Sequence, residues 1–406
     1  MPEAVIVAAA RTPIGRAGKG SLKEVRPDDL AVTAVRAALG QVPDLDPREI
    51  DDLMLGCGLP GGQAGFNMAR VVATLLGYDF LPGTTLTRYC ASSLQTTRMA
   101  LHAIKAGEGD VFISAGVESV SSYAAGSSDS WPDTQNPLFA DAVARTAKRA
   151  EAGAGTWTDP RENGSVPDIY IAMGQTAENL AQVKGVTRRD MDEFGVRSQN
   201  LAEKAIAEGF WAREITPVTL PDGTVVAKDD GPRAGVTLEA VESLKPVFRP
   251  DGTVTAGNCC PLNDGAAALV IMSDTKAREL AIQPLARIVA TGVTALSPEI
   301  MGLGPVEASK QALARAGMSI GDIDLVEINE AFAAQVIPSY RDLGIDIDRL
   351  NVNGGAIAVG HPFGMTGARI TTTLINSLRT HDKQFGLETM CVGGGQGMAL
   401  ILERLS

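Results

Sequence analysis

The chain has 406 residues, of which 45% are hydrophobic and 4% aromatic, and its formal net charge is -12. This length predicts two or three domains with a sizeable core. The negative charge and scarce aromatic rings argue against nucleic acid as a partner. The chain contains no run of about 18 apolar residues, and its N-terminus lacks a cationic stretch followed by an apolar one. We therefore expect a soluble, cytoplasmic protein with no membrane span.

The cysteines and glycines exclude several cofactor sites. Five cysteines, an odd number, predict free thiols in such a chain. No Cys-x-x-Cys pair occurs, so buried structural thiols are favoured over zinc, and no metal is predicted. Gly18-Lys19-Gly20 lacks the first glycine and the final Ser/Thr of a phosphate loop. The glycines at 393–397 lack the spacing of a nicotinamide site.

A weak internal repeat predicts the architecture. Residues 4–8, 49–55 and 92–104 have the same apolar pattern as residues 286–290, 322–328 and 366–378, in the same order. Two halves with the same order of strands and helices imply a duplicated α/β unit, with sheets covered by helices.

A different kind of sequence separates the halves. Residues 121–170 are polar and rich in turn formers. Residues 188–210 then have the period of one amphipathic helix, and Pro221-Asp222-Gly223 predicts a hairpin turn.

Cys90 stands where a helix is predicted to begin. It follows an apolar and β-branched run, and Leu94, Leu101 and Ile104 then repeat with helical period. A helix N-terminus favours a thiolate, and an imidazole of pKa near ~6.5 can take the proton of a thiol that titrates near ~8.5. His361, one of three histidines, lies in a Gly/Pro-rich loop. Cys90 and His361 are therefore predicted to form a nucleophile and its base.

Each of these pieces has a structural alternative. A lone cysteine at this position is often a small buried apolar residue, and Gly360-His361-Pro362 would also suit a tight turn. The glycines after Cys391 could let two strands approach closely. Their joint occurrence with Asn329-Glu330-Ala331-Phe332 favours a catalytic site.

Ordered strings along nearly the whole chain resemble the thiolase family. Besides the segments around Cys90, Asn329, His361 and Cys391, they are Arg11-Thr12-Pro13-Ile14-Gly15, Met173-Gly174-Gln175-Thr176-Ala177-Glu178, Thr255-Ala256-Gly257-Asn258 and Asn263-Asp264-Gly265-Ala266-Ala267. The resemblance implies an α/β, duplicated, layered αβαβα fold with an inserted loop domain. The expected boundaries are residues 1–120 plus 249–275 for the N-terminal half, 121–248 for the loop domain and 276–406 for the C-terminal half.

The resemblance also implies an acyltransferase. The expected reaction is coenzyme A-dependent cleavage of a 3-ketoacyl-CoA to acetyl-CoA and a shortened acyl-CoA, or the reverse condensation, through an acyl-cysteine. Cys90 would be the nucleophile, His361 the base and an oxyanion donor, and Cys391 the general acid/base. Asn329 would hold a water for the enolate oxygen, and the backbone N–H of Gly393 would stabilise the acyl oxyanion. Glu330 would have a supporting role.

Coenzyme A is expected as a substrate, without a permanently bound cofactor. Because it is anionic, its site must be locally basic. Arg233, Cys260 and Met173 are candidate contacts. Further basic residues of the loop domain are candidates for the nucleotide phosphates, namely Lys184, Arg188, Arg189, Lys245 and Arg249.

Two departures from the family pattern bear on the site. Ser93 stands where glycine is usual, and Cys260 stands where serine is usual, near the thioester. Acyl chain length and direction are not fixed by the sequence, although a set of side chains could shape an acyl pocket or belong to the core: Phe66, Tyr89, Met173 and Phe363.

Partners and alternative functions come from the same resemblance. A homodimer or homotetramer in fatty acid β-oxidation is expected, with a multienzyme oxidation complex as a further partner. The alternatives are a decarboxylating ketoacyl synthase, against which Cys391 argues, and a catalytically silent acyl-CoA-binding subunit of such a complex.

Overall fold

The structure, a computed structural model, describes residues 2–129, 131–151, 153 and 155–406. Met1, Ser130, Ala152 and Ala154 lie outside the described residues, so the predicted N-terminal half and polar segment are described without them. No helix of the described part is long and apolar enough to cross a membrane.

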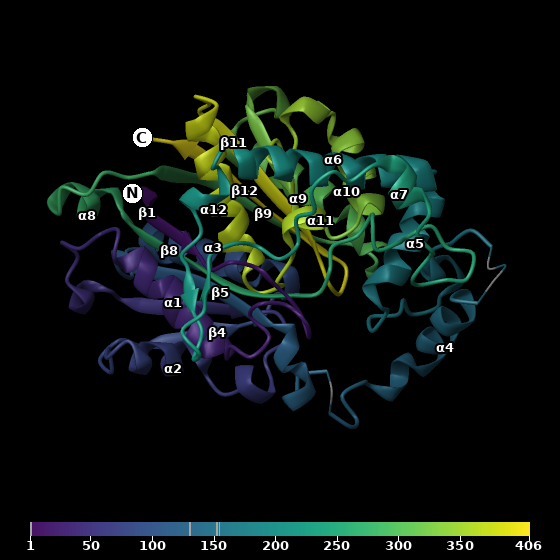
Figure 1. Cartoon of the computed structure of the whole chain (residues 1–406), viewed down its shortest axis with the longest axis horizontal. Helices are drawn as coiled ribbons and strands as arrows, with labels where there is room; N and C mark the ends of the chain where they lie inside the picture. The colour runs from purple at the N-terminus through teal and green to yellow at the C-terminus, as the bar shows by residue number, and fades with distance from the viewer. Residues whose placement is uncertain (1, 130, 152, 154) are drawn as a thin grey trace.

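One large mixed sheet runs through the molecule (Figure 1). Its strand order is β10-β11-β12-β9-β1-β8-β5-β3-β4, and the short β2 pairs with β8. The strands are β1 (Ala4–Arg11), β2 (Gly15–Arg16), β3 (Asp52–Cys57), β4 (Gly83–Leu86), β5 (Val111–Ser119), β8 (Asn263–Ser273), β9 (Ala286–Ala295), β10 (Leu325–Ile328), β11 (Phe385–Val392) and β12 (Gln396–Arg404).

The sheet consists of two halves joined at a narrow seam. Strands β1 and β9 pair only at Val5 with Arg287 and at Ile6 with Ala286, whereas β1 pairs with β8 along its whole length. The seam therefore joins the two strands that the internal repeat relates to each other. The repeat also relates β3 to β10, and each comes after a 3-10 turn, at Pro47–Glu49 and Ile320–Asp322.

Two helices lie between the halves. They are α3 (Ser92–Ala106) and α12 (Thr366–Thr380), the helices predicted by the repeat. Leu94 and Leu374 belong to the same buried cluster as Ile6 and Leu269 of one sheet half and Leu400 of the other. A helix packed on both sides must be buried nearly all round, which explains why most of α12 is apolar or hydroxyl-bearing.

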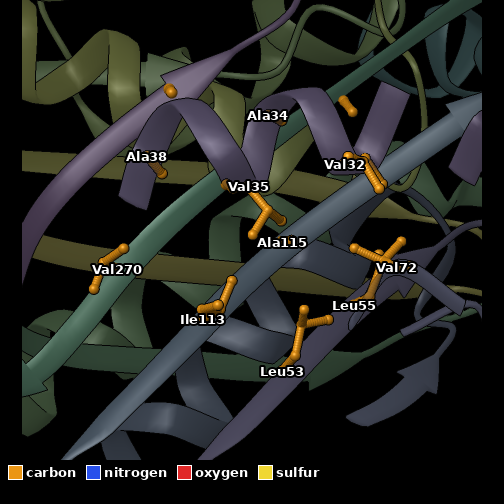
Figure 2. Close-up of a cluster of buried hydrophobic side chains, with 14 of the residues drawn as sticks. Val32, Ala34, Val35, Ala38, Leu53, Leu55, Val72, Ile113, Ala115 and Val270 are labelled. Atoms are coloured by element: carbon orange, nitrogen blue, oxygen red, sulfur yellow. The ribbon is translucent and has the colours of Figure 1, made fainter. Parts of the chain in front are cut away.

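Further helices cover the outer faces. Helices α1 (Pro27–Leu39) and α2 (Met68–Leu75) pack on β3, β5 and β8, where Val35, Ile113 and Val270 belong to one buried cluster (Figure 2). Helices α5 (Met173–Lys184), α9 (Gly304–Ala316) and α10 (Ala333–Leu343) contribute to the core on the other outer face. The order helix, sheet, helix, sheet, helix confirms the predicted layered fold.

The polar segment forms an extension beside the layers, together with the residues that connect it to β8. Helix α4 (Ala140–Arg149) lies at the end of the molecule opposite the two termini (Figure 1). The predicted amphipathic helix is α6 (Arg188–Ala207), which begins at a capping box on Thr187. The hairpin is confirmed as β6 (Val218–Thr219) and β7 (Val225–Val226). The described residues also form the short helices α7 (Leu238–Glu242), α8 (Asp274–Glu279) and α11 (Ala356–Val359).

Candidate active site

Cys90 lies in a strained turn at the start of the central helix α3, as the sequence predicts. It belongs to the 3-10 turn Tyr89–Ala91, and Tyr89 adopts a φ of +45°, which is uncommon for a residue with a side chain. The hydroxyl of Ser92 fixes the turn, because it accepts the N–H of Arg88 at 2.9 Å and donates to the Tyr89 carbonyl at 2.7 Å. Such strain is retained where the surroundings over-determine a geometry.

The loop after Cys391 meets this turn. Cys391 is fully buried near the end of β11, and Gly394 and Gly395 make the turn into β12 with φ of +75° and +79°, which glycine adopts without strain. The backbone N–H of Gly393 acts on the Cys90 thiol and lowers its pKa, in opposition to burial. The predicted oxyanion donor thus lies at the nucleophile.

Two side-chain hydrogen bonds connect the turn of Cys90 to the loop after Cys391. Arg88 donates from Nη1 to Gln396 Oε1 at 2.7 Å, and Gln396 Nε2 donates to the Gly393 carbonyl at 3.2 Å. Neither Arg88 nor Gln396 was predicted from the sequence as a site residue. Both adjoin the motifs around the two cysteines, and this position was the only signal for them.

The loop that carries His361 is anchored through Asn263. The backbone N–H of His361 donates to Asn263 Oδ1 at 2.9 Å, and Asn263 Nδ2 donates to the Gly15 carbonyl at 3.0 Å. The preceding Gly360 has a φ of +113° and leaves no room for a Cβ beside Ile14. The predicted histidine therefore depends on the N-terminal turn and on β8.

Thr366 fixes the proton position on the His361 ring. Its hydroxyl donates to the Pro362 carbonyl at 2.7 Å, and the same oxygen lies 2.6 Å from His361 Nδ1. Because a hydroxyl has one hydrogen, its oxygen must accept from Nδ1–H. Nε2 is then the ring atom that can take a proton, and it lies 3.2 Å from Asn329 Nδ2.

Asn329 and Glu330 come directly after β10 but face different partners. Asn329 is buried against the imidazole. Its backbone carbonyl accepts a hydrogen bond from Gln335 Nε2 at 2.7 Å. Glu330 accepts from Ser198 Oγ, Asn351 Nδ2 and a backbone N–H, and it is fully buried. Through these hydrogen bonds Glu330 joins three segments of the chain, which is a structural role.

Burial shifts the pKa values of the reactive groups towards their neutral forms, in the direction opposite to the thiolate that the helix N-terminus was expected to favour. It raises the pKa of Cys90 to about 12, although the backbone N–H of Gly393 acts in the opposite direction. It lowers the pKa of His361 to about 3, with Arg369 acting in the same direction. Burial also raises the pKa of Cys391 well above its usual range. The structure holds no hydrogen bond between Cys90 and the imidazole among the residues it describes, so desolvation outweighs the helix terminus.

A cavity of about 590 Å³ opens onto Cys90 and His361. Its walls are largely apolar and include Met173 and Phe363. Cys260, the residue that departs from the family pattern, also lines it beside Cys259, and both thiols are free. Arg233 is not among its described lining residues. Two other candidates for the acyl pocket face outward instead: Phe66 is 91% exposed and Tyr89 43%.

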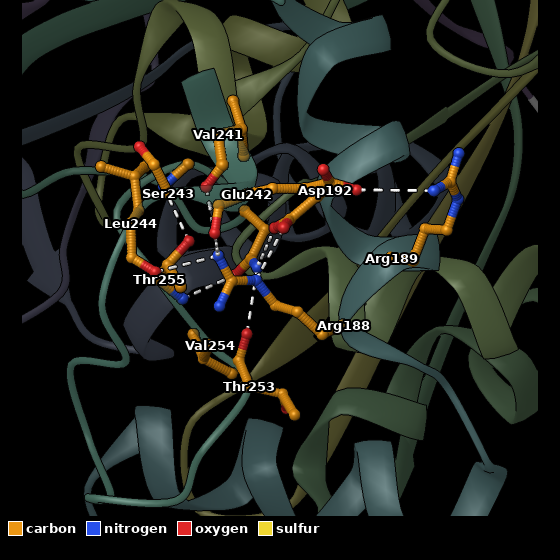
Figure 3. Close-up of polar contacts among 12 residues, drawn as sticks. Arg188, Arg189, Asp192, Val241, Glu242, Ser243, Leu244, Thr253, Val254 and Thr255 are labelled. Carbon is orange, nitrogen blue, oxygen red and sulfur yellow. Dashed lines mark hydrogen bonds and ion pairs between the residues drawn. The ribbon is translucent and has the colours of Figure 1, made fainter. Parts of the chain in front are cut away.

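Most of the basic candidates for phosphate contacts are engaged within the protein. Arg188 bonds to Asp192 and to carbonyl oxygens of Val241 and Leu244 (Figure 3). Three more behave similarly, since Lys184 pairs with Asp342, Arg189 with Glu193 and Glu242, and Arg249 with Gln175 and Asn179. Arg233 and Lys245 make no side-chain contact of this kind with the described residues.

Glu118 is a further buried residue at the site. It is the next-to-last residue of β5. Its carboxylate accepts hydrogen bonds from the backbone N–H groups of Gly58 and Gly364, both at 2.7 Å, and from the Tyr123 hydroxyl at 2.8 Å. Gly364 is three residues beyond His361, so one carboxylate holds the histidine loop against the end of β3. A single acid in the apolar string 111–119 was the signal for it.

The Ser93 departure has a structural explanation. Its hydroxyl is fully buried and accepts the Ala368 backbone N–H at 2.9 Å. The N–H groups in the first turn of a helix have no partner within the helix, so this hydroxyl satisfies one of them in α12. The side chain that replaces glycine here joins the two central helices.

Comparisons with known proteins agree with this arrangement. Residues 4–275 match the family described as thiolase, N-terminal domain, and residues 282–404 match thiolase, C-terminal domain. A 3-ketoacyl-CoA thiolase of Bacillus subtilis is 41% identical over 99% of this chain and all of that protein. A 3-oxoadipyl-CoA/3-oxo-5,6-dehydrosuberyl-CoA thiolase of Escherichia coli is 42% identical over the whole of both chains.

Solved structures give the same result. The acetyl-CoA acetyltransferase of Bacillus anthracis superposes with a TM-score of 0.86 at 40% identity, covering 100% of this chain and 99% of that one. The human mitochondrial 3-ketoacyl-CoA thiolase in complex with CoA superposes with a TM-score of 0.85 at 34% identity, covering 99% and 98%. With this fold, these motifs and relatives matched from end to end, the chain belongs to the thiolase family.

Proposed function

We propose that this thiolase cleaves 3-ketoacyl-CoA with coenzyme A, or runs the reverse condensation, through an acyl thioester on Cys90. The observation that supports this best is that Cys90 and His361 line one largely apolar cavity, with the Gly393 N–H close enough to the Cys90 thiol to lower its pKa. An N–H at that position is where the oxyanion of an acyl-cysteine needs a donor. The alternatives of a decarboxylating synthase and a silent subunit have no comparable support.

In the first half-reaction, His361 Nε2 takes the Cys90 proton as the sulfur attacks the keto carbon. The bond between C2 and C3 breaks, and its electron pair forms the enolate of acetyl-CoA. Cys391, whose raised pKa keeps it a neutral thiol, donates its proton to C2, and acetyl-CoA leaves. Asn329 and the imidazole stabilise the enolate oxygen through a water.

In the second half-reaction the protonated His361 gives its proton to the Cys391 thiolate. Nε2 then takes the proton of the incoming coenzyme A thiol, whose sulfur attacks the acyl carbon. The bond to Cys90 breaks, and Nε2 returns the proton to the Cys90 sulfur, so both cysteines end as thiols. The N–H groups of Cys90 and Gly393 stabilise the tetrahedral oxyanion in both halves.

Coenzyme A binds as a substrate in this reaction, and no permanent cofactor takes part. Met173 and Cys260, which line the cavity, contact the acyl-CoA there. Arg233 contacts the nucleotide part of the ligand outside the cavity. The human relative solved in complex with CoA supports coenzyme A as the ligand.

The biological setting is part of the proposal. The name of the Bacillus subtilis relative supports a role in fatty acid β-oxidation, whereas that of the Escherichia coli relative favours a substrate with a terminal carboxylate. We place the enzyme in the cytoplasm as a homodimer or homotetramer, with a fatty-acid oxidation complex as a further partner. The edge strand β4, which pairs only with β3 among the described strands, is available for such assembly.

Side-by-side cleavage assays with purified protein test the function. Loss of acetoacetyl-CoA and of a long-chain 3-ketoacyl-CoA would be followed with and without coenzyme A. Coenzyme A-dependent cleavage of the long substrate, with or without the short one, supports a β-oxidation thiolase. Cleavage of acetoacetyl-CoA alone supports a short-chain acetyltransferase, and cleavage of neither contradicts the proposal.

A further inference from the structure

Two basic residues line the catalytic cavity, and their side chains have no partner among the described residues. Arg16, half-buried in β2, and Lys19, exposed in the next turn, are the only charged side chains among its described lining residues, apart from the neutral His361. Neither side chain makes a hydrogen bond or ion pair with any residue that the structure describes. This is unusual in a chain of net charge -12, in which other arginines at the site are paired.

The backbone that carries Arg16 is held firmly. Asp230 Oδ2 accepts the N–H groups of Arg16 and Ser21, at 2.9 and 2.8 Å. Gly20 packs so closely that a Cβ there would lie 2.3 Å from Arg16 N. Asp230 thus accepts hydrogen bonds from the backbone of the turn, and the guanidinium of Arg16 can bind another partner.

This turn is also fixed relative to the chemistry. Arg16 pairs with Asn263 in the register of β2 and β8. Asn263 is the residue that holds the His361 backbone on one side and the Gly15 carbonyl on the other. A single side chain therefore sets the distance between the cationic turn and the catalytic base.

We propose that Arg16, assisted by Lys19, binds an anionic oxygen group of the acyl-CoA and sets how the substrate enters the cavity. A guanidinium beside apolar walls gains most from a carboxylate or phosphate, which it can bind through two N–H groups. That anion comes from one of two sources, the phosphates of coenzyme A or a carboxylate at the far end of the acyl chain. The inference rests on the proposed function only for the identity of the ligand as an acyl-CoA.

Binding without turnover tests it. In the Cys90→Ala background, calorimetry measures the Kd of hexanoyl-CoA, adipyl-CoA and hexanoyl-pantetheine, with and without Arg16→Met. Phosphate binding predicts that Arg16→Met weakens both CoA thioesters roughly tenfold and spares the pantetheine thioester. Carboxylate binding predicts a similar loss for adipyl-CoA alone. Either pattern supports the inference, and equal losses for all three ligands, or none, overturn it.

Matched variants guard against loss of structure. Arg16→Lys retains the charge and is expected to restore most of the affinity. Lys19→Met is expected to show the same ligand pattern as Arg16→Met with a smaller effect. Lys23→Met removes an exposed cation of the same segment that lies outside the cavity, and it should leave all three Kd values unchanged. Because none of these values depends on catalysis, failure of the cleavage assays and failure of this inference are distinguishable.

Discussion

At the level of single residues, burial shifts the pKa values of Cys90, His361 and Cys391 towards their neutral forms, and hydrogen bonds hold the loops that carry them. The sequence predicted that Cys90, His361 and Cys391 share one site, and the structure places Cys90 and His361 on one cavity with Cys391 near Cys90, while their roles remain predictions. It could not predict their protonation, because burial depends on side chains from both halves of the chain. Desolvation raises the pKa of Cys90 to about 12 and lowers that of His361 to about 3, so both shifts favour the neutral thiol and the neutral imidazole.

The first prediction concerns the pH dependence of Cys90 alkylation. A neutral thiol whose pKa is raised reacts with iodoacetamide through its small thiolate fraction, so the rate should rise about tenfold per pH unit from pH 7 to 10. Peptide mass spectrometry would monitor Cys90 separately from Cys259. A rate that stays level above pH 6 would instead reveal a preformed thiolate and imidazolium pair.

A second prediction concerns the tautomer of His361. Thr366→Val removes the oxygen that accepts from Nδ1–H, so Nε2 is no longer held as the base, and kcat/KM should fall about 10- to 100-fold with little change in KM. Thr366→Ser should restore activity. Thr380→Val is the matched control, because Thr380 makes the same bond to a carbonyl four residues earlier in α12 but is exposed. Equal losses in both valine variants would refute the role of Thr366.

At the level of helices and strands, segments from different layers hold one another in place at the site. The repeat and the helical period were enough to predict α3 and α12, and the turn residues Pro221-Asp222-Gly223 were enough to predict the hairpin. The cross-links that position the catalytic loops were not predictable, because each joins residues far apart in sequence. Glu118 is the clearest case, since it joins the end of β3 to the loop of His361.

A third prediction concerns this carboxylate. Glu118→Gln turns an acceptor of several N–H and O–H groups into a partial donor, so unfolding free energy should fall by about 2–4 kcal/mol. Activity should fall as well, because Gly364 loses its anchor. Urea unfolding and kcat would be measured together, with Tyr123→Phe as a milder variant that removes one donor. Glu108→Gln, at an exposed position, serves as the control. An equal loss of stability and activity in that variant would contradict the anchoring role of Glu118.

For the molecule as a whole, duplication accounts for the layered architecture. The repeat predicted two similar halves, and their strands β1 and β9 meet at the seam. That the halves share one continuous sheet was not predicted, because pairing across the seam involves only two residues on each strand. The proposed boundaries at residues 120, 248 and 275 remain predictions, as does association through the edge strand β4.

The oligomer prediction is tested in solution. Light scattering on the purified chain should give two or four times the mass of one chain, and charged substitutions on β4, such as Thr84→Lys, should reduce it. A chain that stays monomeric at micromolar concentration would contradict the proposed assembly.

The proposed mechanism requires that Cys90 carries the acyl group and that Cys391 donates the proton to C2. Intact-protein mass spectrometry after incubation with acetyl-CoA separates these roles in the wild type, Cys90→Ala and Cys391→Ala. We expect one acetyl group on the wild type and on Cys391→Ala, none on Cys90→Ala, and slow cleavage of the carbon–carbon bond by Cys391→Ala. Equal acetylation of the wild type and Cys90→Ala would rule out Cys90 as the nucleophile.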